Sequence, residues 1–262
     1  MKQFLLKVLV TCVVGATMII TGCVSSTTVE SKLPDQPAKS DPLYRAQIHT
    51  ERAAEYYRLG KMAVALEAAE QAIAANSNYA PAHNMLGIIY MELRQDAKAQ
   101  QAYEQALKIA PNDSETLNNL GWFICERQSP AKAMPYFERA LQNPIYATPE
   151  QALFNSGVCA RRMGDSAKAE MQLTAALQRQ PNFARAMVEL AELRFSQGRF
   201  KEAENLLAKH NQLVQAPAVG ALYLGVKIAR AQGDKMAEAS YIQQLRRRFP
   251  DAPQTRQALE ER

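Results

Sequence analysis

Few residues of this 262-residue chain are of the types that catalyse reactions or bind metals. It contains three histidines and four cysteines. The histidines, His49, His83 and His210, lie far apart in the sequence, and no Cys-x-x-Cys pair occurs. Neither Gly-x-Ser-x-Gly nor His-Glu-x-x-His is present, and the glycines form no phosphate-binding loop. We therefore expect a protein that is not an enzyme and that has no metal or cofactor site.

The chain also lacks a strong excess of one charge. Its 31 Lys and Arg residues face 26 Asp and Glu residues, which gives a formal net charge of +5. The one dense basic run is Arg246-Arg247-Arg248, for which a solvated helix face is the simplest interpretation and contact with acidic lipid or a partner the alternative. A nucleic-acid-binding domain usually concentrates far more positive charge. We therefore expect no nucleic-acid partner.

Strand-forming residues are sparse as well. Val, Ile and Thr are thinly spread, whereas Ala, Leu, Gln, Glu, Lys and Arg fill most windows of the sequence. These abundant residues have high helix propensity. The composition therefore predicts an all-α fold.

Small residues recur with a period of 34 residues, apart from one step of 36. Alanine stands at positions 65, 99, 133, 169, 203 and 237. Twelve residues before each is another small residue: Ala53, Gly87, Gly121, Gly157, Ala191 and Gly225. Four residues after each alanine lie Ala69, Tyr103, Phe137, Leu173, Leu207 and Tyr241. This pattern resembles the tetratricopeptide repeat, in which two helices cross closely and each hairpin stacks on the next.

The resemblance implies a superhelix of six helical hairpins over residues 46–251. The expected repeats are 46–79, 80–113, 114–147, 150–183, 184–217 and 218–251, followed by a tail or cap at 252–262. Two extra residues between Asn143-Pro144 and Thr148-Pro149 explain the 36-residue step. Pro135 falls inside the second helix of the third repeat, where we expect a kink.

The N-terminal sequence predicts an export signal. An apolar run from Leu5 to Ile20 follows Lys2 and ends in Ile20-Thr21-Gly22-Cys23, which resembles the bacterial lipobox. The resemblance implies that residues 1–22 are a signal peptide and that Cys23 is lipidated and anchors the protein to a membrane. An ordinary signal peptide cut nearby, with Cys23 incidental, is the alternative. Residues 23–45 are rich in Ser, Thr and Pro and are expected to form a flexible tether.

Two cysteines, Cys125 and Cys159, lie in the repeat region. Export would permit a disulfide between them. They fall at positions 12 and 10 of their repeats, however, and these positions point in different directions around a helix. We therefore expect two buried free thiols, with a bridge as the less favoured alternative.

The first helix of each repeat is expected to line a concave groove at about positions 2, 5, 9, 12 and 13. These positions hold a largely apolar set of candidate partner-binding residues: Asn84, Ile88, Met91, Asn118, Trp122, Cys125, Phe154 and Val158. Repeats five and six add Val188, Phe195, Leu222 and Val226. An exposed apolar patch often marks a partner site, here for an apolar helix or extended segment. Alternatively, curvature of the superhelix buries part of this set as core.

A lipobox, a short tether and six repeats resemble the type IV pilus biogenesis/stability lipoproteins, the pilotins of the pilus secretin. The run from Leu117 to Cys125, Leu-Asn-Asn-Leu-Gly-Trp-Phe-Ile-Cys, is the most particular match. The resemblance implies a lipid-anchored protein on the periplasmic face of the outer membrane, and we expect it to be monomeric. It would bind secretin subunits through the groove and promote their localisation and oligomerisation. The alternative is an adaptor for outer-membrane protein assembly or for peptidoglycan enzymes.

Overall fold

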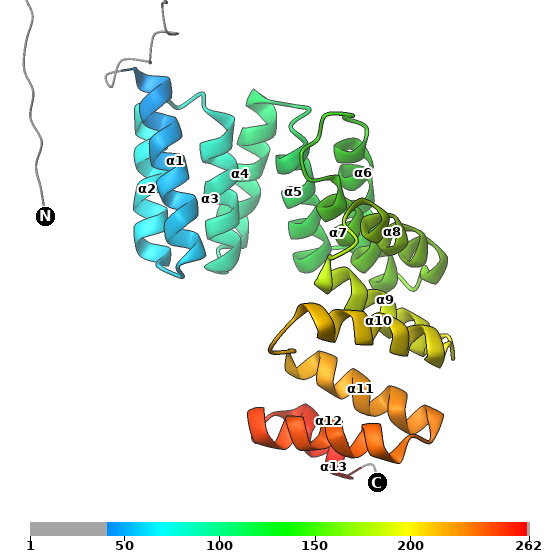
Figure 1. Ribbon diagram of the computed structural model, residues 1–262. Helices are drawn as coiled ribbons and strands as arrows, with labels where there is room; N and C mark the ends of the chain where they lie inside the picture. Colours follow the sequence, from blue (N-terminus) through cyan, green and yellow to red (C-terminus); the bar gives the residue numbers. More distant parts are fainter. Residues whose placement is uncertain (1–40, 261–262) are drawn as a thin grey trace, which may run out of the picture. The chain divides into compact units, whose positions relative to one another are not determined.

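The computed structural model describes residues 41–260, so the expected signal peptide, the lipobox Cys23 and most of the expected tether lie outside the described residues. Thirteen α-helices and no strand occur between residues 41 and 260. Twelve of them form the six expected hairpins (Figure 1): α1 Pro42–Arg58 with α2 Met62–Ala75, α3 Ala80–Glu92 with α4 Asp96–Ile109, α5 Ser114–Arg127 with α6 Pro130–Leu141, α7 Pro149–Arg162 with α8 Ser166–Arg179, α9 Ala184–Ser196 with α10 Phe200–Leu213, and α11 Val219–Gln232 with α12 Lys235–Arg248.

In four of the six hairpins the two helices approach each other where a glycine meets a large side chain. A Cβ atom built on Gly87 would lie 2.5 Å from two ring atoms of Tyr103. The same close approach joins Gly121 to Phe137, at 2.9 Å. It also joins Gly157 to Leu173 and Gly225 to Tyr241. The ring of Tyr103 is 1% exposed, and this burial raises the pKa of its phenol well above the ordinary value, so the phenol stays neutral.

The first helix of each hairpin contacts both helices of the preceding hairpin, and its second helix more extensively than its first. The odd-numbered helices α1, α3, α5, α7, α9 and α11 contact one another in that order. No even-numbered helix of the described chain contacts the next even-numbered helix. The first helices therefore lie on the inner side of the stack and the second helices on the outer side. Each hairpin buries its apolar residues against the next one.

The N-terminal end of the stack differs slightly from the expected boundary, whereas the C-terminal helix lies within the expected tail or cap at 252–262. Helix α1 begins at Pro42, four residues before the expected first repeat, because Asp41 accepts a hydrogen bond from the Leu43 amide at 2.9 Å and Pro42 takes the first helical position. The four residues 42–45, expected in the tether, are therefore helical. At the other end, α13 Pro253–Glu260 packs against α11 and α12 and covers the last hairpin.

The irregular third repeat is accommodated locally. Helix α6 continues through Pro135 to Leu141, so the proline does not end it. Residues 142–148 then form the lengthened connection to α7.

Within residues 41–260 no helix has the length and apolar character that a membrane crossing requires.

The glycine contacts predict an unusual response to Gly87→Ala. This change should lower the free energy of unfolding by about 1–2 kcal/mol, because overlap with the Tyr103 ring outweighs the better helix propensity of alanine. Thermal or urea unfolding followed by circular dichroism measures the effect.

The matched control is Gly220→Ala in α11, where an added Cβ meets no atom within 4 Å. This variant should be at least as stable as the wild type. Adding Tyr103→Leu to Gly87→Ala should restore part of the lost stability, since the fifth repeat pairs Ala191 with Leu207. Equal stability of Gly87→Ala and Gly220→Ala would contradict the proposed close approach.

Candidate functional site

The inner side of the stack is the candidate partner-binding surface. We call it the A-helix face, defined by the polar and aromatic side chains that link consecutive first helices: Asn84, Asn118, Asn119, Trp122, Phe154, Asn155, Arg162, Arg185, Phe195 and Lys227. None of these links involves an even-numbered helix. The face is therefore built by packing between repeats rather than within one repeat.

Asparagine side chains connect the first helices of repeats two, three and four. The Asn119 amide donates to the Oδ1 of Asn84 at 3.1 Å, from α5 to α3. The Asn155 amide donates to the Oδ1 of Asn118 at 2.9 Å, from α7 to α5. Asn84 and Asn118 are buried, while Asn119 and Asn155 are half-buried. Buried amides need partners, so these bonds set how the three helices face one another.

Trp122 lies at the junction between repeats three and four. It is half-buried and packs against the apolar core of both repeats. The guanidinium carbon of Arg162 stands 5.4 Å from its ring centroid, within the range of a cation–π contact. The Arg162 side chain also forms an ion pair with Glu126 at 2.5 Å. The indole therefore stabilises the junction and still offers part of its surface to a partner.

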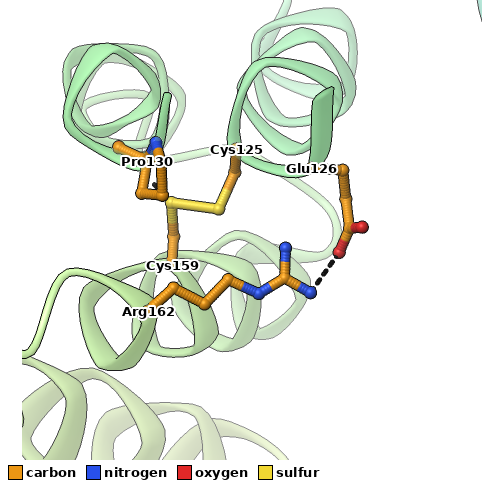
Figure 2. Close-up of a disulfide and its surroundings, with 5 residues drawn as sticks. All are labelled: Cys125, Glu126, Pro130, Cys159 and Arg162. Atoms are coloured by element: carbon orange, nitrogen blue, oxygen red, sulfur yellow. Dashed lines mark hydrogen bonds and ion pairs between the residues drawn. A yellow bond between two sulfur atoms is a disulfide. The ribbon is translucent and has the colours of Figure 1, made fainter. Parts of the chain in front are cut away.

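A disulfide joins the same two helices. Cys125 of α5 and Cys159 of α7 are bonded, with their Cα atoms 6.0 Å apart. Figure 2 shows the bridge beside the Glu126–Arg162 ion pair. Our expectation of two free thiols is wrong. Neighbouring first helices face each other, so contacts join different repeat positions: Phe195 and Lys227 also meet, and they too occupy positions 12 and 10.

Cations cover aromatic rings at two further junctions. The Arg185 guanidinium of α9 lies 4.6 Å from the Phe154 ring centroid of α7. The Lys227 ammonium of α11 lies 5.3 Å from the Phe195 ring centroid of α9. Together with Arg162 over Trp122, each of three successive junctions pairs an aromatic residue with a cation from the next repeat. The A-helix face is therefore more polar and more positive than the sequence pattern predicts.

The expected exposed apolar patch is not found in the form predicted. Five of the eight candidate residues are buried: Asn84, Asn118, Cys125, Phe154 and Val158. The other three, Ile88, Met91 and Trp122, are half-buried and pack against one apolar cluster. In the later repeats Leu222 and Val226 are buried, while Val188 and Phe195 are half-buried. The apolar side chains of this set pack in clusters that join consecutive repeats or, in the last repeat, the C-terminal helix, so much of the set is core.

The sequence analysis did not predict several residues of the A-helix face. Asn119, Asn155, Arg185 and Lys227 fall at repeat positions 6, 6, 2 and 10, and three of these four lie outside the positions that were considered. Arg185 occupies a considered position but is charged. A search for a cation one repeat after each aromatic residue of a first helix would have found the cation–ring pairs.

No group of three or more His, Cys, Asp or Glu side chains that could hold a metal occurs within the described part of the chain. The three histidines are separated there too. His83 Nε2 lies 2.9 Å from the Ser77 carbonyl oxygen, and buried His210 Nδ1 lies 3.0 Å from the Asn211 side-chain oxygen. These contacts are local, between residues close in sequence.

The disulfide should contribute measurably to stability. Replacing both Cys125 and Cys159 by serine should lower the free energy of unfolding by about 3–4 kcal/mol, because the bridge closes a loop with a sequence separation of 34 residues. Urea unfolding of the oxidised protein with and without a reducing agent measures this difference. The double serine variant is the control, since reductant should not change it. A wild type insensitive to reductant would contradict the assigned role.

Family models support the repeat architecture directly. Models described as tetratricopeptide repeat match residues 80–113, 102–134 and 160–223. No curated protein sequence is a significant match to the chain.

Solved structures extend the likeness over most of the chain. PilW, described as a widely conserved type IV pilus biogenesis factor, is 35% identical with a TM-score of 0.76, and the match covers 82% of this chain and 98% of that one. PilF of Pseudomonas aeruginosa is 21% identical with a TM-score of 0.76, covering 84% and 99%. A tetratricopeptide repeat protein of Parabacteroides merdae is 19% identical with a TM-score of 0.61, covering 87% and 86%. PilF and the Parabacteroides merdae protein share the fold of this chain. With its all-α repeat superhelix and its identity to PilW, the chain belongs to the family of tetratricopeptide-repeat proteins that includes PilW.

Proposed function

We propose that this protein is an outer-membrane lipoprotein scaffold of type IV pilus biogenesis. In this proposal it is anchored by a lipid on Cys23, faces the periplasm, and binds subunits of the pilus secretin. Binding promotes the localisation of these subunits to the outer membrane and their oligomerisation into a channel. The protein works as a monomeric scaffold and not as an enzyme.

The similarity to PilW carries the proposal. PilW is described as a type IV pilus biogenesis factor, and its likeness to this chain extends over nearly the whole of its own length. A match over 82% of this chain is far longer than one generic hairpin. The lipobox-like sequence before Cys23 supports the proposed location.

The A-helix face supplies a surface suited to a protein segment. Trp122 is the one tryptophan of the chain, is half-buried, and stands beside the half-buried Met91 and Ile88 in the same cluster. Trp and Met are frequent anchors of protein interfaces. The adjoining Asn119 and Asn155 are partly open to solvent and carry groups that can hydrogen-bond a main chain.

Membrane attachment would strengthen a weak contact. Cys23 precedes α1 by roughly twenty residues, so a lipid there would hold the repeats close to the membrane in which the channel assembles. Tethering raises the effective concentration of the two partners. A modest intrinsic affinity of the A-helix face would then suffice.

In-cell photocrosslinking from position 122 tests the proposal. With p-benzoylphenylalanine in place of Trp122, we expect an adduct whose second component is the pilus secretin, identified by mass spectrometry. A large aromatic replacement keeps much of the core contact that Trp122 makes on both sides of its junction. Deletion of the gene should also reduce secretin multimers and twitching motility.

The matched control places the same photoreactive residue at Met171. This residue is 59% exposed on α8, a second helix on the outer side of the stack. It should give no secretin adduct. Adducts from position 122 to outer-membrane assembly factors or peptidoglycan enzymes, with none to the secretin, would favour the adaptor role instead.

A further inference from the structure

The last three first helices carry six cations, of which four have carboxylate partners. Arg161 of α7 pairs with Glu189 and Glu192, and Arg162 pairs with Glu126. Arg194 of α9 pairs with Glu170 at 2.5 Å, and Arg230 of α11 with Glu238 at 2.7 Å. The two remaining cations, Arg185 and Lys227, have no carboxylate within ion-pair distance in the described chain. These two are also the ones that lie over phenylalanine rings of the A-helix face.

Arg185 is exposed, but its position is constrained. Its guanidinium covers the ring of Phe154, which is only 2% exposed and packs at 5.1 Å against the ring of Phe183. A planar guanidinium on an aromatic face keeps its N–H groups at the edge, where they can pair with a carboxylate in bidentate geometry. A cation held in this way loses little further side-chain freedom when an anion binds.

Lys227 is held between two rings. Its ammonium lies 5.3 Å from the ring centroid of Phe195 and 5.2 Å from that of Tyr223. The side chain is half-buried, so the rings replace part of its hydration. A carboxylate arriving from outside would therefore meet a partly desolvated cation, and such a pair is stronger than one between two fully solvated groups.

The two cations stand near opposite ends of α9. Arg185 belongs to its first turn, and the ring beneath Lys227 belongs to Phe195, ten residues later. Ten residues of helix rise about 15 Å. Between them on the same helix lie Val188, which is half-buried, and the paired Glu189 and Glu192. A segment lying along α9 could reach both cations with about three helical turns or about five extended residues.

We propose that the part of the A-helix face formed by α7, α9 and α11 docks an acidic segment of a protein partner, whose carboxylates pair with Arg185 and Lys227. A protein segment fits better than a continuous polyanion or an anionic membrane, because Glu189 and Glu192 lie on the same helix and would repel uniformly spread negative charge. A polypeptide can place carboxylates only opposite the cations and apolar side chains opposite Val188. For the identity of the partner, this inference rests on the proposed function.

Binding of the purified full-length protein, in detergent micelles, to the periplasmic region of the pilus secretin tests the proposal. The variants Arg185→Glu and Lys227→Glu should each weaken binding about five- to tenfold, and raising the salt concentration should weaken the wild type in the same direction. Lys132→Glu is the matched control, because it reverses an exposed cation on the outer helix α6. It should leave binding unchanged. Arg185→Gln and Lys227→Gln repeat the test without charge reversal, and circular dichroism checks that every variant is folded.

The outcomes separate this inference from the proposed function. Secretin binding that is unchanged in both glutamate variants would overturn the acidic-segment proposal and leave the proposed function intact. No secretin binding by the wild type would contradict the proposed function instead. In that case, the second test measures binding of a labelled 15-residue helical peptide with glutamates ten residues apart to the wild-type protein. The same peptide with glutamines in place of the glutamates is the comparison.

Tighter binding of the glutamate peptide, lost in Arg185→Glu and Lys227→Glu, would support the acidic-segment proposal without the secretin. Equal binding of the two peptides would overturn it. Phosphatidylglycerol vesicles are the remaining probe. Wild-type binding to them that both glutamate variants lose would overturn the proposal in favour of contact with a membrane.

Discussion

The structure depends on a small residue at the crossing of the two helices of a hairpin, a glycine in four of the six repeats and an alanine in the other two. At Gly87, Gly121, Gly157 and Gly225 the second helix places a large side chain where a Cβ would otherwise stand. This approach brings the helices of a hairpin close enough to act as one rigid unit. A rigid hairpin can present its first helix to the next repeat in a reproducible orientation. All the contacts of the A-helix face, from the asparagine pairs to the cation–ring pairs, require that orientation.

The junction between repeats three and four combines more kinds of interaction than its neighbours. It holds the Cys125–Cys159 bridge, the Glu126–Arg162 ion pair, the stacked Trp122 and the hydrogen bond between Asn118 and Asn155. The lengthened connection of residues 142–148 leads into the same junction. A longer connection fixes the orientation of the next hairpin less firmly. The contacts between the first helices fix that orientation from the inner side of the stack. Some of the side chains that stabilise this junction are therefore also candidates for binding a partner.

Hairpin boundaries could be predicted from the sequence because small and large residues must alternate where helices cross. The positions of Gly87 and Tyr103, for example, follow from one steric requirement repeated every 34 residues. Contacts between repeats could not be predicted in this way. Cys125 and Cys159 meet, and Phe154 is buried, because of how the next first helix crosses the previous one, and the repeat pattern does not contain that crossing. The charges of Arg185 and Lys227 are visible in the sequence, but only the fold shows that no carboxylate among residues 41–260 pairs with them.

Under the proposed anchoring of one end to a membrane, the covalent bridge has a mechanical consequence. When a partner pulls on the repeats, tension passes through the chain from its anchored end to the point of contact. Between Cys125 and Cys159 the load would bypass the intervening polypeptide and cross the sulfur–sulfur bond. A sequence separation of 34 residues corresponds to about 110–120 Å of extended chain that a pulling force cannot release. The chain between Cys125 and Cys159 therefore cannot extend under load, and any stretching is confined to the chain outside this loop.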